Sequence, residues 1–303
     1  MLRLEGLTKK YGNELAVDYI SMKVFPGTLV ILAGADGAGK STLLKMIVGL
    51  VHKDSGEIYL DDIAIGSNFR RITSRSGYMP ERFSLYTDLS VEENLNFFAD
   101  IYGVSRSRRE DLKQRLLDKT GMAAFKKRKA GELSGGMKQK LALSTILLSS
   151  PEIIFLDEPT TGVDPLSRIE FFNIINELKQ EGRTILVSTP YLSEAEKGDI
   201  VVFIKKGRKI KEGTIKDLKA GFPGKLYEII PKGNIFDVWE KIQSDRELKD
   251  DVYIRGNTLR YMQTGSDNFI SRIPSVKIKE ERVSLEDIYL FYEKNHIIGQ
   301  DSL

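Results

Sequence analysis

The sequence predicts an α/β protein built around a mainly parallel sheet, and three observations indicate this fold class. Apolar runs of strand length occur at 29–33, 153–156 and 184–188, and they alternate with stretches of helical periodicity. A glycine-rich segment joins the first of these strands to a helix. At 303 residues, the chain has the length of about two domains, and a linker-like break at 220–224 separates residues 1–220 from a predicted small α+β domain.

The glycine-rich segment fits a phosphate-binding loop, G-x-x-x-x-G-K-[ST]. It reads Gly34, Ala35, Asp36, Gly37, Ala38, Gly39, Lys40 and Ser41, with Thr42 after it. Glycines let main-chain N–H groups wrap a phosphate, and the following helix directs its positive end at the same anion. Lys40 supplies a cation and the Ser41 hydroxyl a Mg²⁺ ligand. The strand before and the helix after favour this interpretation over a glycine-rich surface turn.

The remaining elements follow from periodicity and from residues typical of helix and strand ends. Before the loop, short strands are predicted at 2–4 and 22–25. After it, we expect an edge strand with a turn at 56–65 and a short strand at 76–79. A helical region follows at 90–150, with a capping box at Ser90–Glu93. Pro165 is placed to begin a helix. Beyond the linker the expected order is a strand, a helix, a hairpin turning at Gly256 and a closing helix, at 226–230, 235–248, 252–261 and 285–292.

Two acids follow the apolar run 153–156 directly. In a parallel sheet, ligands bind at the carboxyl ends of the strands, and a carboxylate at such an end can meet the Mg²⁺ held by the phosphate loop. Asp157 is therefore the predicted Mg²⁺ ligand. Glu158, where the chain turns, can orient or deprotonate a water molecule at the terminal phosphate. The alternative is a pair of surface or capping acids.

A second anion site is predicted at the start of another helix. Ser134 is a good N-cap, and Gly135 and Gly136 leave bare N–H groups in the first turn. One terminal phosphate does not need two such sites in one chain.

The whole segment 133–139, Leu-Ser-Gly-Gly-Met-Lys-Gln, is similar to the LSGGxxQ signature of ATP-binding cassette (ABC) transporters. With the phosphate loop, Asp157–Glu158 and the D-loop segment 161–164, the chain resembles a nucleotide-binding subunit of that family over residues 1 to about 215. The resemblance implies a P-loop NTPase (RecA-like) core with an antiparallel β subdomain and a helical subdomain at about 85–145. The tail at 225–303 is similar to the C-terminal extension of drug- and polymer-export members.

The resemblance also implies partners and residue roles. Two cassettes dimerise head to tail, so that each ATP lies between one phosphate loop and the signature of the other cassette. The residues that would contact the partner's nucleotide are Ser134, Gly135, Gly136 and Gln139, with Asp164 in the D-loop. Tyr11 would stack on adenine, although a core or edge tyrosine is the alternative. The implied ligands are ATP and Mg²⁺, the latter held by Ser41, Asp157 and Glu81, and the implied partners include integral membrane subunits that contact the loop 81–89.

Three positions depart from the family pattern. Asp36 stands where asparagine is usual. Glu81 replaces the Q-loop glutamine, and an ionised glutamate only accepts hydrogen bonds; it stays a candidate catalytic residue beside Glu158. Pro190 replaces a histidine that contacts the terminal phosphate, and neither of the two histidines, His52 and His296, lies near it in sequence. We therefore expect this chain's own site to hydrolyse ATP slowly, which favours an asymmetric pair of cassettes. A homodimer in which Glu158 carries most of the catalysis is the alternative.

Composition limits the other function classes. Hydrophobic residues are 41% and charged residues 29% of the chain, and the net charge of +3 gives no argument for nucleic acid. The sequence has no run of 18 apolar residues and no signal-peptide pattern at Met1, which predicts a cytoplasmic protein. The resemblance, with its membrane partners, implies a peripheral position on the inner face of the cell membrane. The absence of cysteine excludes disulfides.

Two other functions stay open. One is a cassette ATPase acting on DNA or the ribosome, although the chain has no long coiled coil between loop and signature and only one cassette. The other is an ATP-sensing cassette with little turnover. The transported substrate cannot be read from this chain, because membrane subunits would select it.

Overall fold

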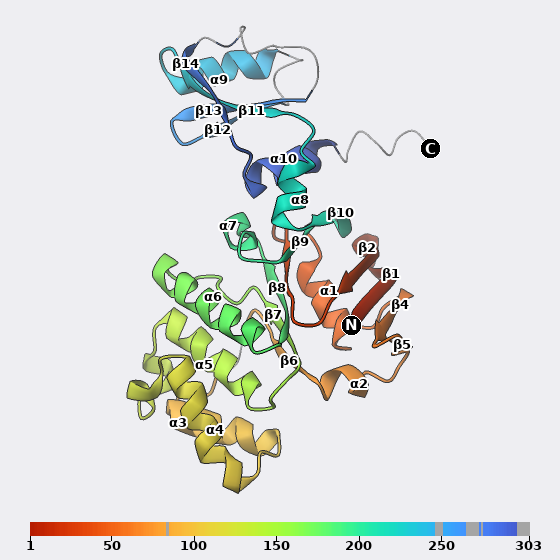
Figure 1. The fold of residues 1–303 in the computed structure, drawn as a ribbon, viewed down its shortest axis with the longest axis vertical. Helices are drawn as coiled ribbons and strands as arrows, with labels where there is room; N and C mark the ends of the chain where they lie inside the picture. The colour runs from red at the N-terminus through yellow and green to blue at the C-terminus, as the bar shows by residue number, and fades with distance from the viewer. Residues whose placement is uncertain (83–84, 246–250, 265–272, 274, 296–303) are drawn as a thin grey trace. The chain divides into compact units, whose positions relative to one another are not determined.

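The computed structural model describes residues 1–82, 85–245, 251–264, 273 and 275–295 (Figure 1). It divides the chain into two compact units, Met1–Glu212 and Gly213–Leu303. The division lies before helix α8 (Ile215–Ala220) rather than after it, where the sequence placed the boundary. In the described part of the chain, no α-helix has the length and apolarity that crossing a bilayer requires.

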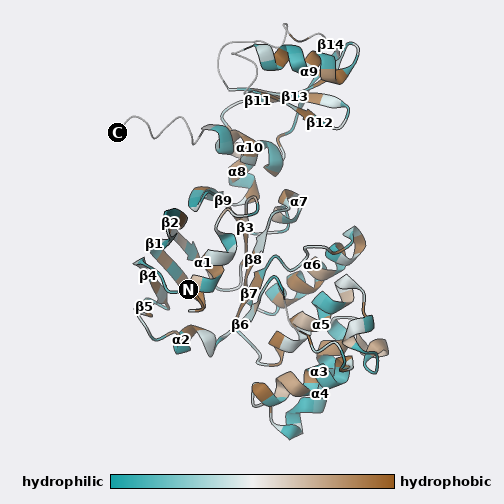
Figure 2. Cartoon of the chain, turned by 180° about the vertical axis from the view of Figure 1, so that it is seen from behind, coloured by the Kyte–Doolittle hydropathy of each residue, from teal (hydrophilic) through white to brown (hydrophobic). Residues whose placement is uncertain are grey.

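A six-stranded sheet forms the centre of the first unit. Its strand order is β10-β9-β3-β8-β7-β6, with bounds Arg208–Gly213, Ile200–Lys205, Leu29–Ala33, Thr184–Thr189, Ile153–Asp157 and Ser76–Met79. Strand β3 pairs in parallel with β8 and β9, and β7 pairs in parallel with β8 and β6. All residues of β3, β7 and β8 are buried, and the apolar stretches of these strands are brown in Figure 2. The predicted mainly parallel α/β fold is confirmed, and the carboxyl ends of β3, β7 and β8 meet at one edge.

A second, antiparallel sheet belongs to the same unit. Its order is β2-β1-β4-β5, with bounds Glu14–Val24, Leu2–Tyr11, Ser55–Leu60 and Ile63–Ala64. Strands are present at 2–4 and 22–24 as predicted, but they are longer than expected, because β1 and β2 form one long hairpin interrupted by shifts of register. Helix α1 (Lys40–Ile47) shares a buried apolar core with this sheet, and α2 (Arg70–Thr73) adds Ile72 to it.

Helices complete the first unit. They are α3 (Val91–Ile101), α4 (Arg106–Lys119), α5 (Gly135–Leu147), α6 (Pro165–Gln180) and α7 (Leu192–Ala195), with 3-10 turns at Ala123–Phe125 and Ala130–Glu132. The predicted capping box is confirmed, since Ser90 and Glu93 each accept a hydrogen bond from the other's backbone N–H. Pro165 begins α6 as predicted, behind the N-cap Asp164.

The second unit is a four-stranded sheet of order β12-β13-β11-β14 with three helices. Its elements are α8, β11 (Lys225–Pro231), α9 (Ile235–Ser244), β12 (Val252–Arg255), β13 (Thr258–Gln263), β14 (Ser275–Glu281) and α10 (Leu285–Asn295). The predicted hairpin turns at Gly256, whose φ is 58°. Helix α9 ends at Ser244 instead of 248; residues 246–248 and His296 lie outside the described residues. Apolar side chains of α9, Val238 and Ile242, share a core with the sheet.

Candidate functional site

The loop between β3 and α1 is shaped by backbone that presses against it. A Cβ atom on Gly34 would lie 2.2 Å from the Ile204 carbonyl oxygen, and one on Gly39 would lie 2.0 Å from the Ala16 carbonyl oxygen. Gly37 and Gly39 have φ values of 75° and 101°, which side chains rarely allow. Glycine is therefore the residue that suits these positions. The neighbouring backbone packs against the loop and holds it beside the N-terminus of α1.

Lys40 is the buried cation of this loop, with 2% of its surface exposed. Its Nζ donates to the carbonyl oxygens of Gly34 at 2.8 Å and Ala35 at 2.9 Å. The same nitrogen lies 3.2 Å from Glu158 Oε1. Residues more than a hundred positions apart in sequence therefore meet at the sheet edge, as the strand pattern predicted.

Asp157, which is 1% exposed, is the centre of a hydroxyl cluster. Its Oδ1 accepts hydrogen bonds from Ser41 Oγ at 2.8 Å and from Ser188 Oγ at 2.6 Å, and its Oδ2 accepts one from Tyr78 OH at 3.2 Å. Burial, and then the charge of Asp157, raise the pKa of the Tyr78 hydroxyl, which therefore stays protonated and donates.

Sequence reasoning missed Ser188 and Tyr78. Both lie on strands that neighbour β7, and Ser188 is directly opposite Asp157 in the β7–β8 register. The one sequence signal that could have pointed to Ser188 was the polar end of the apolar strand 184–187. The contact with Asp157 could not be predicted, because strand order cannot be read from local patterns.

Glu158 turns the chain away from β7 with a φ of 48°, in the left-handed region that glycine favours. Its N–H donates to the Ser188 carbonyl oxygen at 3.1 Å and to Ser188 Oγ at 2.9 Å. Its side chain, 11% exposed, faces Lys40.

The donor set at this edge fits Mg²⁺. Ser41 Oγ and Asp157 Oδ1 are hard oxygen ligands in contact with one another, and Mg²⁺ is usually bound by one or two carboxylates together with phosphates and waters. Within the described residues no cluster of three or more His, Cys, Asp or Glu forms a complete protein cage. Glu81 is exposed, and no hydrogen bond or ion pair among the described residues joins it to Ser41 or Asp157.

The segment 133–139 has a different environment. Ser134 caps α5 by accepting from the Met137 N–H at 3.3 Å, and both Ser134 and Gly135 are exposed. Gly136 is buried, and a Cβ there would lie 2.5 Å from Ser167 Cβ. Gln139 and Gly135 line a cleft of about 370 Å³, which Glu81 and Leu85 also line. This bare helix start has no anionic partner within the described chain.

The other predicted residues are placed as follows. Asp164 accepts from the Ser167 N–H at 3.0 Å, and hydrogen bonds from the Ser167 hydroxyl and then its backbone lower the pKa of the Asp164 carboxyl. Tyr11 ends β1 with 49% of its surface exposed, and Lys9 Nζ lies 5.4 Å from the centre of its ring. Asp36 is exposed, Ala38 is buried, and Thr42 is half-buried on α1. Pro190 follows β8 and is half-buried.

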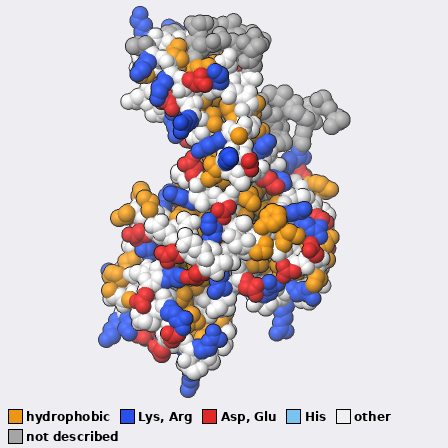
Figure 3. All heavy atoms as spheres, viewed as in Figure 1, with side chains coloured by type: hydrophobic (Ala, Val, Ile, Leu, Met, Phe, Trp, Pro, Cys, Tyr) orange, Lys and Arg blue, Asp and Glu red, His pale blue; other side chains and the backbone are white. Residues whose placement is uncertain are grey.

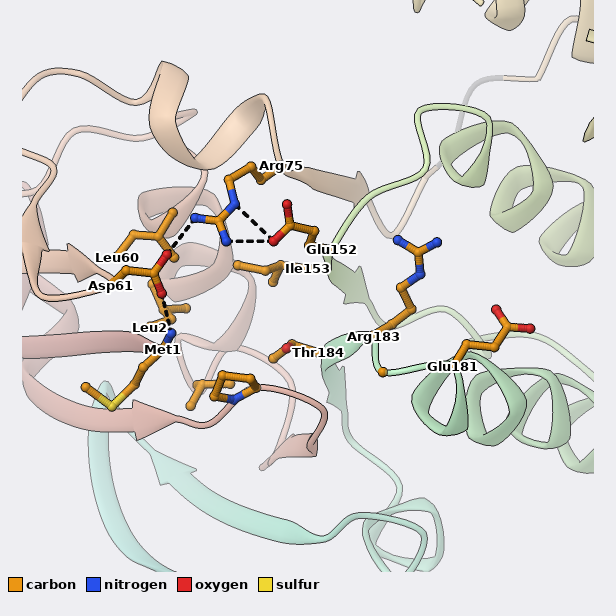
Figure 4. Close-up of a pocket in the computed structure, with 13 residues that line it drawn as sticks. Met1, Leu2, Leu60, Asp61, Arg75, Glu152, Ile153, Glu181, Arg183 and Thr184 are labelled. Atoms are coloured by element: carbon orange, nitrogen blue, oxygen red, sulfur yellow. Dashed lines mark hydrogen bonds and ion pairs between the residues drawn. The ribbon is translucent and has the colours of Figure 1, made fainter. Parts of the chain in front are cut away.

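A separate hollow of about 300 Å³ lies at the amino ends of β7 and β8, away from the phosphate loop (Figure 4). Several of its charged groups pair with one another. Arg75 Nη1 lies 2.6 Å from Asp61 and its Nη2 lies 2.6 Å from Glu152, while Asp61 also binds the Met1 amine. These bonds raise the pKa of Arg75. The ion pairs account for these three side chains without a ligand, and Arg183 donates to the backbone carbonyls of Ser150 and Pro151.

Comparisons with known proteins agree with this geometry. A family profile described as "ABC transporter" matches residues 17–161. The Nod factor export ATP-binding protein I of Burkholderia orbicola is 40% identical over 210 residues, 69% of this chain and 69% of that protein. The probable multidrug ABC transporter ATP-binding protein YbhF of Escherichia coli is 40% identical over 229 residues, 75% of this chain, but the match spans only 40% of the length of YbhF.

Solved structures give the same result. A structure titled as the ATP-binding subunit of an ABC transporter has a TM-score of 0.65 at 31% identity, and covers 73% of this chain and 93% of that one. The dimeric post-hydrolysis structure of the cassette MJ0796 bound to ADP and Pi has a TM-score of 0.64 at 25% identity, and covers 71% and 98% of the two chains. The core of this chain is thus the P-loop fold of an ABC ATPase. The chain belongs to the ABC transporter family, as one of its ATP-binding subunits.

Proposed function

We propose that this chain is the ATPase subunit of an ABC exporter, which binds MgATP at the phosphate loop and couples its hydrolysis to membrane subunits. One observation carries the proposal: Lys40, Ser41, Asp157 and Glu158 converge in one buried cluster at the carboxyl edge of the sheet. A cation, a hydroxyl and two carboxylates in contact are what phosphoryl transfer requires.

Each residue has a distinct role in this proposal. Residues 34–42 hold the phosphates through backbone N–H groups, with Lys40 at the terminal phosphates. Ser41 and Asp157 would hold Mg²⁺, which neutralises charge on the phosphates when bound. Glu158 orients and deprotonates the attacking water. Tyr11, exposed at the end of β1, would stack on the adenine ring, and Glu81, which is also exposed, would be the further ligand of the metal.

The exposed start of α5 supports a second cassette as partner. Ser134 and Gly135 are exposed, and the N–H groups of a first helical turn have no partner within the helix, so they can meet the terminal phosphate of another cassette's nucleotide. The solved MJ0796 cassette is dimeric in its ADP-bound and Pi-bound state, which is a precedent within the family. Gln139 and Asp164 would lie in the same interface.

An aromatic patch supports membrane subunits as further partners. It consists of Tyr86, Phe97, Ile101 and Tyr102, which are between 37% and 60% exposed. The rings of Tyr86 and Phe97 pack edge to face with centroids 4.4 Å apart. Exposed apolar clusters of this kind mark protein–protein contacts. The patch adjoins the predicted coupling loop, of which Phe83 lies outside the described residues. Such docking would hold the chain at the cytoplasmic face of a membrane.

Export is the direction that the relatives' names support, since they include a Nod factor export protein and a probable multidrug transporter. On the face drawn in Figure 3, basic and acidic side chains are interspersed, so this face offers no support for a nucleic-acid partner.

Pro190 supports the asymmetric form of this proposal. It follows β8 close to Ser188 and offers neither a side-chain donor nor an N–H, so no group at this position can bind a phosphate. Losing one transition-state hydrogen bond commonly lowers turnover roughly a hundredfold to a thousandfold. A slow site on this chain would then pair with a fast site on a different cassette, while the homodimer is the competing form.

Co-purification from native membranes, followed by ATPase assays of the wild type and Glu158→Gln, tests the proposal. An asymmetric pair should contain a second cassette and keep most of its turnover in the variant, because the fast site belongs to the partner. A homodimer should lose nearly all turnover. An assembly with neither ATP binding nor ATPase activity, or one without membrane subunits, would contradict the function proposed here.

A further inference from the structure

Ser188, at the end of β8, touches both carboxylate-bearing residues of the site. It is fully buried and pairs with Asp157 in the parallel register between β7 and β8. We propose that Ser188 is a positioning residue, whose single hydroxyl fixes the Asp157 carboxylate for Mg²⁺ and the Glu158 backbone for catalysis.

The geometry uses both capacities of a hydroxyl. Ser188 Oγ donates to Asp157 Oδ1 at 2.6 Å and accepts from the Glu158 N–H at 2.9 Å. A serine hydroxyl has one donor hydrogen and two acceptor lone pairs, so these bonds are compatible. Oδ1 is also the oxygen that contacts Ser41 Oγ, at 2.8 Å. Ser188 therefore orients the oxygen that faces the other proposed metal ligand.

Glu158 needs this support because of its backbone conformation. Its φ of 48° is unfavourable for a residue with a Cβ, and such conformations persist where the surroundings hold them. The Glu158 N–H is bonded to both the hydroxyl and the carbonyl oxygen of Ser188. Removing the hydroxyl leaves the amide only the longer of these bonds, at 3.1 Å.

Neighbouring hydroxyl groups cannot replace this one. Tyr78 OH reaches the other oxygen of Asp157, at 3.2 Å, so it restrains the carboxylate without touching Glu158. Thr189 is the next residue, and its hydroxyl donates to Glu194. Removing Ser188 Oγ should therefore weaken the restraint on the Asp157 carboxylate in part, and the restraint on the Glu158 backbone to a large extent.

The inference rests on the proposed binding of MgATP by the phosphate loop. Groups that orient a metal ligand typically change metal affinity or activity by about tenfold to a hundredfold when removed. For Ser188→Ala we expect about a tenfold smaller gain in affinity for nucleotide when Mg²⁺ is added. Affinity without Mg²⁺ should change less than about twofold, because no phosphate contact is lost.

The test measures binding of a fluorescent ATP analogue to the full chain, with Mg²⁺ and with EDTA. Ser144→Ala is the matched control, since Ser144 is also fully buried and its hydroxyl bonds Lys140 O at 2.9 Å, away from the site. Ser188→Thr keeps the hydroxyl and should restore the Mg²⁺ effect. If the extra methyl group of threonine prevents folding, the comparison of Ser188→Ala with Ser144→Ala still tests the inference.

A Mg²⁺ effect in Ser188→Ala equal to that of the wild type would overturn the inference and leave the proposed function intact. So would equal losses in Ser188→Ala and Ser144→Ala, since these would indicate a general effect of removing a buried hydroxyl. Failure of the wild type to bind the analogue at all would instead contradict the proposed function.

Discussion

The phosphate loop and the segment 133–139 are both helix starts rich in glycine, yet their surroundings are opposite. Around the loop, Lys40 and Asp157 are almost fully buried and bonded to groups of the same chain. At the second helix start, Ser134 and Gly135 are exposed, and among the described residues the Ser134 side chain bonds only within its own cap. At the phosphate loop the buried charged groups are held by their own chain, whereas the second helix start is open to a different molecule. The predictions below test whether this division is real.

The largest effect is expected for Lys40→Ala. Hydrogen bonds to charged groups contribute about 1.5–3 kcal/mol each, so loss of this cation should weaken ATP binding about tenfold to a hundredfold for each bond lost. Titration with a fluorescent nucleotide measures this. Lys45→Ala, on the same helix, is the control and should bind as the wild type does. Equal affinity in both variants would refute the assignment of the loop.

Gly135→Asp should affect the second helix start without affecting the phosphate loop. The new carboxylate would face the partner's terminal phosphate, where repulsion amounts to a few kcal/mol, so ATP-dependent association should weaken roughly tenfold or more. Association is measured by sedimentation of chains that carry Glu158→Gln, in which hydrolysis is slowed, with and without Gly135→Asp. Binding of nucleotide to the isolated chain should not change. Undiminished association would mean that this surface does not meet nucleotide.

Gly136→Ala should act on stability instead. Its Cβ would lie 2.5 Å from Ser167 Cβ, where overpacking costs about 2 kcal/mol. Gly135→Ala has its nearest neighbour at 3.6 Å and should be neutral or slightly stabilising. Chemical denaturation of both variants gives the difference, and equal stabilities would show that α5 and α6 can separate at little cost.

The smallest effect is expected for Tyr11→Ala. Aromatic stacking contributes about 1 kcal/mol, so affinity for ATP should fall about fivefold. Tyr11→Phe keeps the ring and should retain the affinity. The stability should hardly change, because the side chain is half exposed. An unchanged affinity in Tyr11→Ala would leave Tyr11 as an ordinary residue at a strand edge.

The sequence could predict those parts of the site that depend on short segments. The loop, the two acids after an apolar strand and the cap Ser134 all follow from neighbouring residues. The fold class followed in the same way, since fully apolar runs are typical of parallel strands with both faces covered.

Contacts between distant strands could not be predicted. Ser188 and Tyr78 reach Asp157 only because β8 and β6 both flank β7. A buried pairing near the site is another example. Glu194, which is 5% exposed, accepts hydrogen bonds from Thr160, at 2.6 Å, and from Thr189. It ties the segment after Glu158 to the end of β8, although in the sequence it reads as a surface acid in a charged stretch.

The close approach of Ile204 and Ala16 to the glycines of the loop has a consequence for saturation mutagenesis. Any side chain at Gly34 or Gly39 would collide with main-chain carbonyl groups of the protein itself. Loss of function at these two positions would then result from a displaced protein backbone and not from a lost contact with the ligand. Tolerance to substitution is therefore a poor guide to which loop residues contact a phosphate.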